Sequence, residues 1–274
     1  MGTDKEGAHS YADAYEWHFR HLRHRAITLL EIGVGGYRDS TSGGESLRMW
    51  KEFFPRAQII GIDIHPKEGL SEDRIAILQG DQSDEKFLDD VASRYGPFDV
   101  VIDDGSHICA HVIASFRALF PHLAEDGIYA IEDLQTSYWA RGYGGSSGLD
   151  RAGTSMTFLQ ELVDGLNYAE FDIPNYVPAY TDTWIRSLTF YHNMAFVQKG
   201  ANTEGSNVLQ PHPRPATVLA LASAPASTRS PASPPRRWFR RLVPKRLRGV
   251  MISTIRTVAR AAPKALGRNH GRDP

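Results

Sequence analysis

The stretch AITLLEIGVGG, residues 26 to 36, decides the fold class because it joins an apolar run to a glycine-rich turn. An apolar run of this length is typical of a strand buried on both faces of a parallel sheet. Four later stretches repeat the pattern at residues 57–64, 75–81, 98–104 and 127–134. Amphipathic segments at 44–54, 84–95 and 111–123 separate them and have the spacing of helices. We therefore predict an α/β, doubly wound, Rossmann-like fold.

The alternation changes after a further predicted helix at residues 154–167, which begins at a Thr/Ser cap. Residues 183–200, TWIRSLTFYHNMAFVQKG, contain two strand-like runs that meet at His192 and Asn193. No residues are left between them for a crossover helix, so these two strands must be antiparallel. The prediction is a seven-stranded, mostly parallel sheet with a C-terminal antiparallel hairpin.

Composition narrows the class of protein. The chain has 274 residues, of which 41% are hydrophobic, and a single cysteine, Cys109. One cysteine excludes a disulfide framework and a cysteine-rich metal site, and it suits a reducing, cytoplasmic setting. The sequence shows neither an apolar run long enough to cross a membrane nor the apolar core of a signal peptide.

The charge is unevenly distributed along the chain. Fourteen of the 31 basic residues but only one of the 32 acidic residues lie after Gln210. We predict a folded domain at 1–200, a Pro/Ala/Ser-rich linker at 201–235 and a basic tail at 236–274. The tail is either a disordered, solvated extension or an amphipathic segment that contacts an anionic membrane, which would place the protein peripherally at that membrane. Nucleic acid is a weaker alternative as a partner for the tail.

Polar residues follow the first three predicted strands. The glycine turn LEIGVGG ends the first strand, Asp63 the second, and Asp81 with Gln82 the third. A carboxylate at the second position can accept both ribose hydroxyls of a nucleoside. The alternative is a tight turn with two surface acids. Tyr37 and Arg38 stand where a dinucleotide fingerprint would continue to its third glycine, which argues against NAD.

Two pairs of acids end the next two strands, Asp103 with Asp104 and Glu132 with Asp133. Neighbouring strands lie about 4.8 Å apart, so these carboxylates can converge and then need a cation to offset their repulsion. Oxygen ligands without cysteine favour Mg²⁺, Mn²⁺ or Ca²⁺. His107, expected at the start of the following helix, could act as a general base there. The alternative is a helix capped by Asp104 or Ser106, with a surface histidine and solvated acids.

Five motifs in order resemble the macrocin and mycinamicin sugar O-methyltransferases: TDKEGAHSY, LLEIGVGG, GGESLRMWKEFFPRAQIIGIDI, DVVIDDGSH and IEDLQTSYW. The resemblance covers about residues 3 to 200 and implies a class I methyltransferase that uses S-adenosylmethionine and Mg²⁺. It implies that Asp104, Glu132 and Asp133 bind the metal and that His107 is the general base. The expected cofactor contacts are Glu31, Gly33, Gly35, Asp63, Asp81, Gln82 and Asp103.

The resemblance also implies an acceptor, namely a sugar hydroxyl of a glycosylated natural product or a polysaccharide, as in macrolide antibiotic biosynthesis. The macrolide enzymes carry an additional N-terminal domain that helps their assembly, whereas the resemblance in this chain begins at the catalytic domain. The basic tail of this chain has no counterpart in those enzymes. These two differences leave the oligomeric state open, and a homo-oligomer is one possibility. Two rival functions stay open: methylation of a catechol or another phenol, and a non-catalytic nucleoside-binding protein. The loop from Thr136 to Asp150, with Tyr138, Trp139 and Tyr143, is either a lid that stacks on a sugar or an ordinary surface loop.

Overall fold

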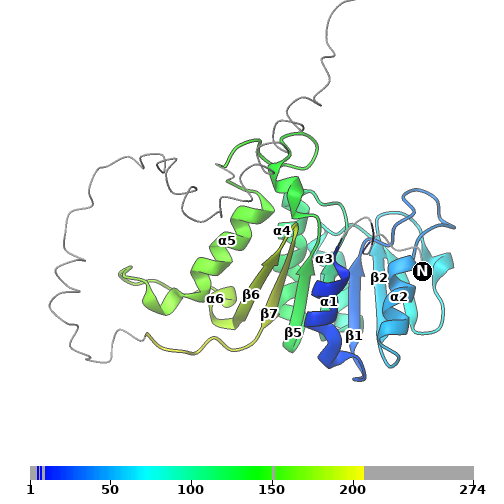
Figure 1. Cartoon of the computed structure of the whole chain (residues 1–274), viewed down its shortest axis with the longest axis horizontal. Coiled ribbons are helices and arrows are strands. Elements are labelled where there is room, and N and C mark those ends of the chain that lie inside the picture. Colours follow the sequence, from blue (N-terminus) through cyan, green and yellow to red (C-terminus); the bar gives the residue numbers. More distant parts are fainter. Residues whose placement is uncertain (1–4, 6, 8–9, 150–151, 207–274) are drawn as a thin grey trace, which may run out of the picture. The chain divides into compact units, whose positions relative to one another are not determined.

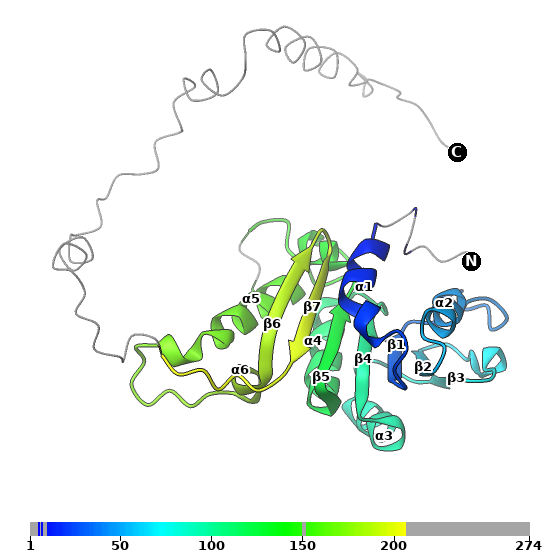
Figure 2. The same cartoon turned by 60° about the horizontal axis from the view of Figure 1, so that its bottom comes forward.

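A mixed sheet of seven strands forms the centre of the computed structural model, which describes residues 5, 7, 10–149 and 152–206. The strand order is β3-β2-β1-β4-β5-β7-β6, and the first five strands are parallel (Figures 1 and 2). The strands are β1 (Thr28–Ile32), β2 (Gln58–Asp63), β3 (Ile75–Gln79), β4 (Phe98–Asp103), β5 (Leu123–Ile131), β6 (Ile185–Tyr191) and β7 (Met194–Lys199). The doubly wound Rossmann-like prediction is confirmed.

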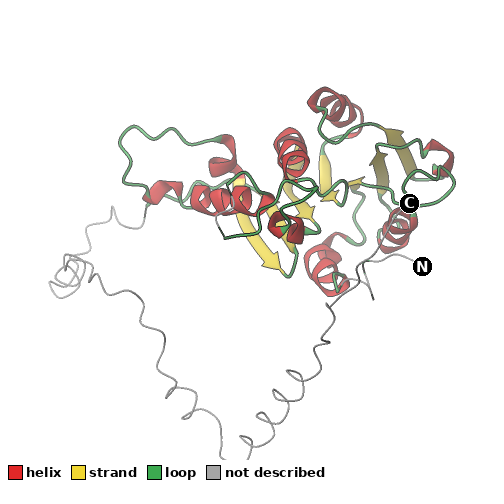
Figure 3. Cartoon of the chain, turned by 90° about the horizontal axis from the view of Figure 1, so that it is seen from above, coloured by secondary structure: helices red, strands yellow, loops and turns green. Residues whose placement is uncertain are grey.

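Helices cover both faces of this sheet, as the view from above shows (Figure 3). They are α1 (Ala12–Phe19), α2 (Glu45–Phe53), α3 (Glu85–Tyr95), α4 (Cys109–Leu119), α5 (Ser155–Leu166) and α6 (Tyr180–Trp184). Side chains of α1 and α2, such as Phe19 and Trp50, share one buried core with β1 and β7. Side chains of α3, α4 and α5, such as Val91, Phe116 and Leu159, form the core on the opposite face.

The hairpin of β6 and β7 has the predicted form. The two strands are antiparallel, with Tyr191 opposite Met194, so that His192 and Asn193 make the turn. Asn193 has a φ of 62°, a left-handed conformation that asparagine tolerates better than most residues. The amide of Leu134 donates to the carbonyl of Asn193 at 2.9 Å, which ties the turn to the chain that leaves β5.

The helix caps in the structure agree only in part with those predicted from the sequence. The hydroxyl of Thr154 accepts from the amide of Thr157 at 3.2 Å and caps α5 as predicted. Helix α4, however, begins at Cys109 with Ile108 at its N-cap and without a side-chain cap. The alternative in which Asp104 or Ser106 caps α4 is therefore wrong, and His107 lies in the loop before the helix, not at its start.

The register of the parallel strands places the carboxyl ends of β1, β4 and β5 at one level. Ile32 lies opposite Asp103, and Asp103 lies opposite Ile131, so Gly33, Asp104 and Glu132 follow side by side. Gly33 has a φ of +94°, and a Cβ atom there would stand 2.2 Å from the backbone oxygen of Asp104. Only glycine permits this close approach, which brings the loops after β1 and β4 together.

The predicted tail lies outside the described residues, as do most of the predicted linker and its boundary at residue 235. The ordered packing extends slightly past Gly200, because the side-chain amide of Asn202 donates to the carbonyls of Leu166 and Asp182 at 2.9 and 2.8 Å. Within the described part of the chain, no helix is long and apolar enough to cross a membrane.

Candidate active site at the carboxyl edge of the sheet

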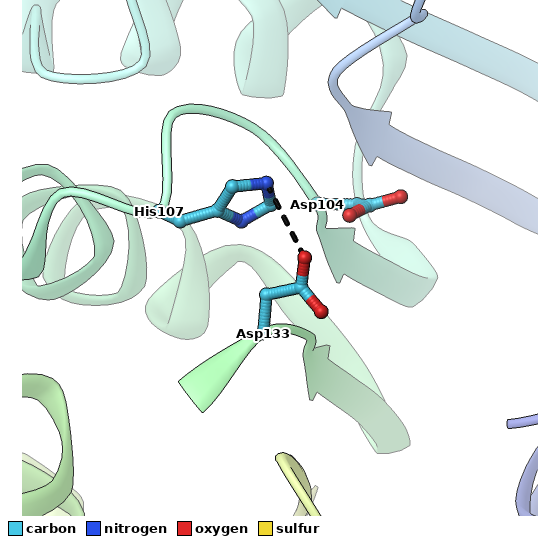
Figure 4. Close-up of side chains that lie close together, drawn as sticks. All are labelled: Asp104, His107 and Asp133. Carbon is cyan, nitrogen blue, oxygen red and sulfur yellow. Dashed lines mark ion pairs between the residues drawn. The ribbon is translucent and has the colours of Figure 1, made fainter. Parts of the chain in front are cut away.

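Three predicted site residues converge where β4 and β5 end. Asp104, His107 and Asp133 each offer one possible metal-ligand atom, and these atoms lie within 4.8 Å of one another. Figure 4 shows the imidazole of His107 and the carboxylate of Asp133 pointing toward each other, with Nε2 3.6 Å from Oδ2. The carboxylates of Asp104 and Asp133 are hard oxygen ligands of the kind that Mg²⁺ and Mn²⁺ prefer, so these two residues fit a hard divalent cation.

The backbone at this cluster is in an unusual conformation. His107 and Asp133 both have a φ of 54°, in the left-handed region that non-glycine residues rarely adopt. Such residues cost on the order of 1–3 kcal/mol each and concentrate at functional sites. Their coincidence at the two facing loops points to a geometry that the surrounding structure maintains.

Glu132 lies beside this cluster but contacts other groups. Its side chain is almost fully buried, and Oε1 accepts from the ammonium of Lys5 and from the hydroxyl of Tyr15, both at 2.5 Å. The reading of Glu132 as a solvated strand end is therefore wrong. Its role as a metal ligand stays a prediction.

Lys5 forms the centre of a buried charged group. Its ammonium lies 2.8 Å from Oδ2 of Asp104, 2.5 Å from Oε1 of Glu132 and 3.3 Å from Oε1 of Glu31. Burial alone would lower the pKa of Lys5, but attraction to the three carboxylates outweighs it and raises the pKa well above its ordinary value. Lys5 belongs to the motif TDKEGAHSY, but the motif alone did not reveal that its side chain contacts these three acids.

The acids of this group experience opposing effects. Burial is the larger effect and raises the pKa of Glu132 and of Glu31 above their ordinary values, although the ammonium of Lys5 lowers both. The ionised form of Glu132 agrees better with the geometry, because a neutral carboxyl would leave the buried charge of Lys5 with less compensation. Oε1 of Glu31 is buried, and among the described residues it has no hydrogen-bond partner, although the ammonium of Lys5 lies at ion-pair distance, 3.3 Å.

Asp103 points into the protein, away from the edge where Asp104 lies. It is 1% exposed and accepts from the hydroxyl of Ser115 at 2.5 Å and from Nε2 of Gln82 at 3.1 Å. Burial raises the pKa of Asp103 to about 6, and the hydrogen bond from Ser115 partly offsets that rise. Oε1 of Gln82 accepts from the amide of Ser106 at 2.6 Å, so Gln82 joins Asp103 to the loop that carries His107.

The hydroxyl of Ser106 lies 3.1 Å from Nδ1 of His111, which identifies His111 as a residue that supports the loop. The loop after β5 also contributes support, because the carbonyl of Tyr143 accepts from the amide of Cys109 at 2.8 Å. Trp139 is half exposed, and its ring packs edge-on against Tyr143 with 5.5 Å between the ring centroids. These contacts place the aromatic residues next to the start of α4.

The residues predicted to bind a nucleoside follow β1, β2 and β3. Asp63 accepts from the amide of Val34 at 3.0 Å and from that of His65 at 2.8 Å. At Gly35, an added Cβ would have its nearest neighbour, the Cα of Gly43, 4.0 Å away, so the backbone is open to a ligand there. Asp81 is partly exposed and accepts from the amide and the hydroxyl of Ser83 at 2.8 and 2.7 Å. Asp63, which is partly exposed and lies beside the open glycine turn at Gly35, fits a nucleoside.

The predicted cofactor contacts therefore divide into two groups. Gly35, Asp63 and Asp81 lie where a ligand could reach them. The side chains of Glu31, Gln82 and Asp103 are buried and serve internal contacts. All of these assignments stay predictions, together with that of Gly33.

A cavity of about 780 Å³ lies next to the carboxyl edge of the sheet where Asp104, His107 and Asp133 converge (the metal edge). It lies between α5, the turn of the β6–β7 hairpin and the chain that follows Asp133. Most of its lining side chains are apolar or aromatic: Leu134, Tyr138, Met156, Gln160, Val163, Asp164, Phe190, Tyr191, His192 and Asn193. A cavity of this volume is large enough for a drug-sized molecule.

Comparisons with known proteins show similar sequences and similar structures. The chain is 52% identical over 199 residues to the mycinamicin VI 2''-O-methyltransferase of Micromonospora griseorubida, covering 72% of this chain and 50% of the relative. It is 50% identical over 203 residues to the 8-demethyl-8-alpha-L-rhamnosyl tetracenomycin-C 2'-O-methyltransferase of Streptomyces olivaceus, covering 74% and 53%. It is 48% identical over 206 residues to the demethylmacrocin O-methyltransferase of Streptomyces fradiae, covering 74% and 52%.

Among solved structures, MycE methyltransferase of the mycinamycin pathway, in complex with Mg, SAH and mycinamycin VI, superimposes with a TM-score of 0.75. That match has 49% sequence identity and covers 81% of this chain and 57% of MycE. The chain spans about half the length of the curated relatives it matches. No family model matches the chain.

Proposed function

We propose that the chain belongs to the macrocin and mycinamicin family of sugar O-methyltransferases and that it methylates a sugar hydroxyl. The methyl donor is S-adenosylmethionine, and the acceptor is a sugar carried by a natural product or polysaccharide. The observation that carries the proposal is the convergence of Asp104, His107 and Asp133 at the edge beside the cavity. MycE, a relative of the same fold, has been solved with Mg and SAH.

Asp104 and Asp133 would hold the divalent cation, with Glu132 as the further predicted ligand. A bound divalent cation acts as a Lewis acid that makes a coordinated hydroxyl more acidic. The chain itself contributes the carboxylates of Asp104 and Asp133 directly after β4 and β5, and Asp133 lies beside the imidazole of His107. An acceptor hydroxyl at this cluster would therefore lie close to the base.

His107 is the proposed general base. Its Nε2 lies 3.6 Å from Oδ2 of Asp133, which can stabilise the imidazolium that forms when the ring takes a proton. The acceptor hydroxyl gives its proton to His107, and its oxygen then forms the new bond to the methyl carbon. The bond from that carbon to sulfur breaks, its electron pair stays on sulfur, and S-adenosylhomocysteine leaves uncharged at sulfur.

Asp63 is the proposed partner of the ribose hydroxyls, since its carboxylate is fixed by two backbone amides at the end of β2. The turn at Gly33 and Gly35 would let the donor approach the backbone. The cavity between α5 and the hairpin would receive the apolar body of the acceptor, because Leu134, which directly follows Asp133, is one of its lining residues. The sugar would then lie between that body and the metal edge.

The test is a transfer assay with S-adenosylmethionine, Mg²⁺ and a panel of acceptors that contains deoxysugar glycosides, mannosides, and catechols or other phenols. A methyl ether on a sugar oxygen supports the proposal. A methyl group found only on phenolic acceptors would assign the reaction to the rival class.

We also propose a cytoplasmic location, where the free, buried thiol of Cys109 stays reduced. Contact with an anionic membrane through the basic tail, and a homo-oligomeric state, stay predictions. Liposome pelleting of the full chain and of a chain truncated at Gly200 tests the membrane contact. Equal pelleting of the two would exclude an anchor in the tail.

A further inference from the structure

We propose that three residues, Lys5, Tyr11 and Tyr15, form the outer shell of the metal site. In this arrangement Lys5, Tyr11 and Tyr15 are positioning residues, which act on the acids and not on the substrate. The inference rests on the proposed metal-dependent function, and it adds a set of residues outside the strand-end motifs.

The contact between Tyr11 and Asp133 is the first part of this shell. The phenol of Tyr11 donates to Oδ1 of Asp133 at 2.9 Å. The other oxygen, Oδ2, is the one that lies 3.6 Å from Nε2 of His107. Tyr11 therefore fixes the rotation of this carboxylate and directs its second oxygen toward the cluster of Asp104, His107 and Asp133.

Lys5 and Tyr15 hold the other two acids in the same manner. Lys5 bridges Oδ2 of Asp104 and Oε1 of Glu132, and Tyr15 donates to that same Oε1. Each acid is thus held through one named oxygen by a donor from the N-terminal segment. The positive charge of Lys5 also reduces the repulsion among carboxylates that must stay close before a cation binds.

These donors are themselves rigidly placed. Tyr11 and Tyr15 are 4% and 3% exposed. The ring of Tyr15 packs edge-on against Trp50 at 4.9 Å and against Phe196 at 5.6 Å between centroids. The docking of α1 on the sheet therefore delivers the donors to acids that lie 99 to 127 residues away in the sequence.

The energetic consequence follows from the role of outer-shell groups at metal sites. Removing such a partner costs about 10- to 100-fold in metal affinity, because the ligand loses its orientation and must be ordered when the metal binds. Tyr-to-Phe substitutions are the cleanest probes, since they delete one hydroxyl and change neither charge nor ring packing. Lys5 is less suitable, because its removal would alter charge and orientation together.

The experiment measures Mn²⁺ binding by calorimetry in the absence of acceptor, for the wild type, Tyr11→Phe, Tyr15→Phe and the double variant. Tyr168→Phe is the matched control, because its phenol donates to the carbonyl of Asn202 at 3.3 Å, away from the metal edge. We expect each single variant to bind Mn²⁺ about 10-fold more weakly, and the double variant up to about 100-fold. S-adenosylmethionine affinity and melting temperature should stay close to those of the control.

Two outcomes would overturn the inference while leaving the proposed function intact. In one, the wild type binds Mn²⁺ and both single variants bind it within twofold of the wild type. In the other, Mn²⁺ and S-adenosylmethionine affinities fall together with the melting temperature, which is the result of a merely structural role. A wild type that does not bind Mn²⁺ would overturn both the metal-dependent function and this inference.

Discussion

Gly33 links the stability of the fold to the geometry of the site, and its replacement by alanine makes a quantitative test. The φ of +94° costs an alanine roughly 1–2 kcal/mol by itself. The added Cβ would also stand 2.2 Å from the backbone oxygen of Asp104, and relieving such overpacking costs roughly 1–3 kcal/mol more. We therefore expect Gly33→Ala to lower the free energy of unfolding by roughly 2–5 kcal/mol.

Thermal unfolding followed by circular dichroism measures this loss. A loss of that size in a domain of about 200 residues lowers the melting temperature by roughly 5–15 °C. Gly35→Ala is the matched control, because it has a φ of +79° but no neighbour of the new Cβ closer than 4.0 Å. It should lose only the conformational part, roughly 1–2 kcal/mol. Equal melting temperatures for the two variants would refute the claim that the loops after β1 and β4 meet at Gly33.

Further predictions concern the chemistry and its support. His107→Ala should lower turnover by about 10²- to 10⁴-fold, with S-adenosylmethionine affinity unchanged in calorimetry, and wild-type turnover would remove His107 from the role of base. Exhaustive chelation should abolish methyl transfer in a radiolabel assay and added Mg²⁺ should restore it, whereas activity that survives chelation would exclude the metal. Ser115→Ala should lower the free energy of unfolding by about 1–3 kcal/mol in urea titrations, because buried Asp103 loses a donor; an unchanged midpoint would contradict that. Val163→Asp should raise KM for acceptors with an apolar body more than for a simple methyl glycoside, and equal effects would place the acceptor outside the cavity.

Much of the fold could be predicted because its signals are local. Apolar runs such as residues 98–104 and the short hairpin turn at His192 and Asn193 specify strand type and direction within a few residues. Acids directly after buried strands also predicted where a site would form, and the structure brings Asp104, His107 and Asp133 together there. The strand register explains why these residues meet, because the adjacent parallel strands β1, β4 and β5 end at the same level.

What the sequence could not predict depends on contacts between distant segments. Lys5, Tyr11 and Tyr15 reach the acids only because α1 docks beside the carboxyl ends of the strands. The motif TDKEGAHSY contains Lys5, but the motif alone does not say which group its ammonium meets. Alternation along β4 places Asp103 and Asp104 on opposite sides of the strand, yet only the partners Gln82 and Ser115 show that Asp103 faces inward.

The same limitation applies to His107. Its distance of three residues from Asp104 suggested the start of a helix, but the chain adopts a left-handed conformation at His107 and α4 begins two residues later. This loop conformation is maintained by the hydrogen bond from Ser106 to Gln82, which is 24 residues away in the sequence. A signal of that range is not visible in a local pattern.

The central proposal is that the protein methylates a sugar hydroxyl at the carboxyl edge of its sheet and that a divalent cation takes part in the reaction. Its most direct test is to incubate the protein with S-adenosylmethionine, Mg²⁺ and a sugar-bearing acceptor and to locate the transferred methyl group by NMR. The account predicts a methyl ether on one sugar oxygen, which disappears on chelation and in His107→Ala. A protein that binds the donor and the cation but transfers the methyl group to no sugar oxygen would contradict it.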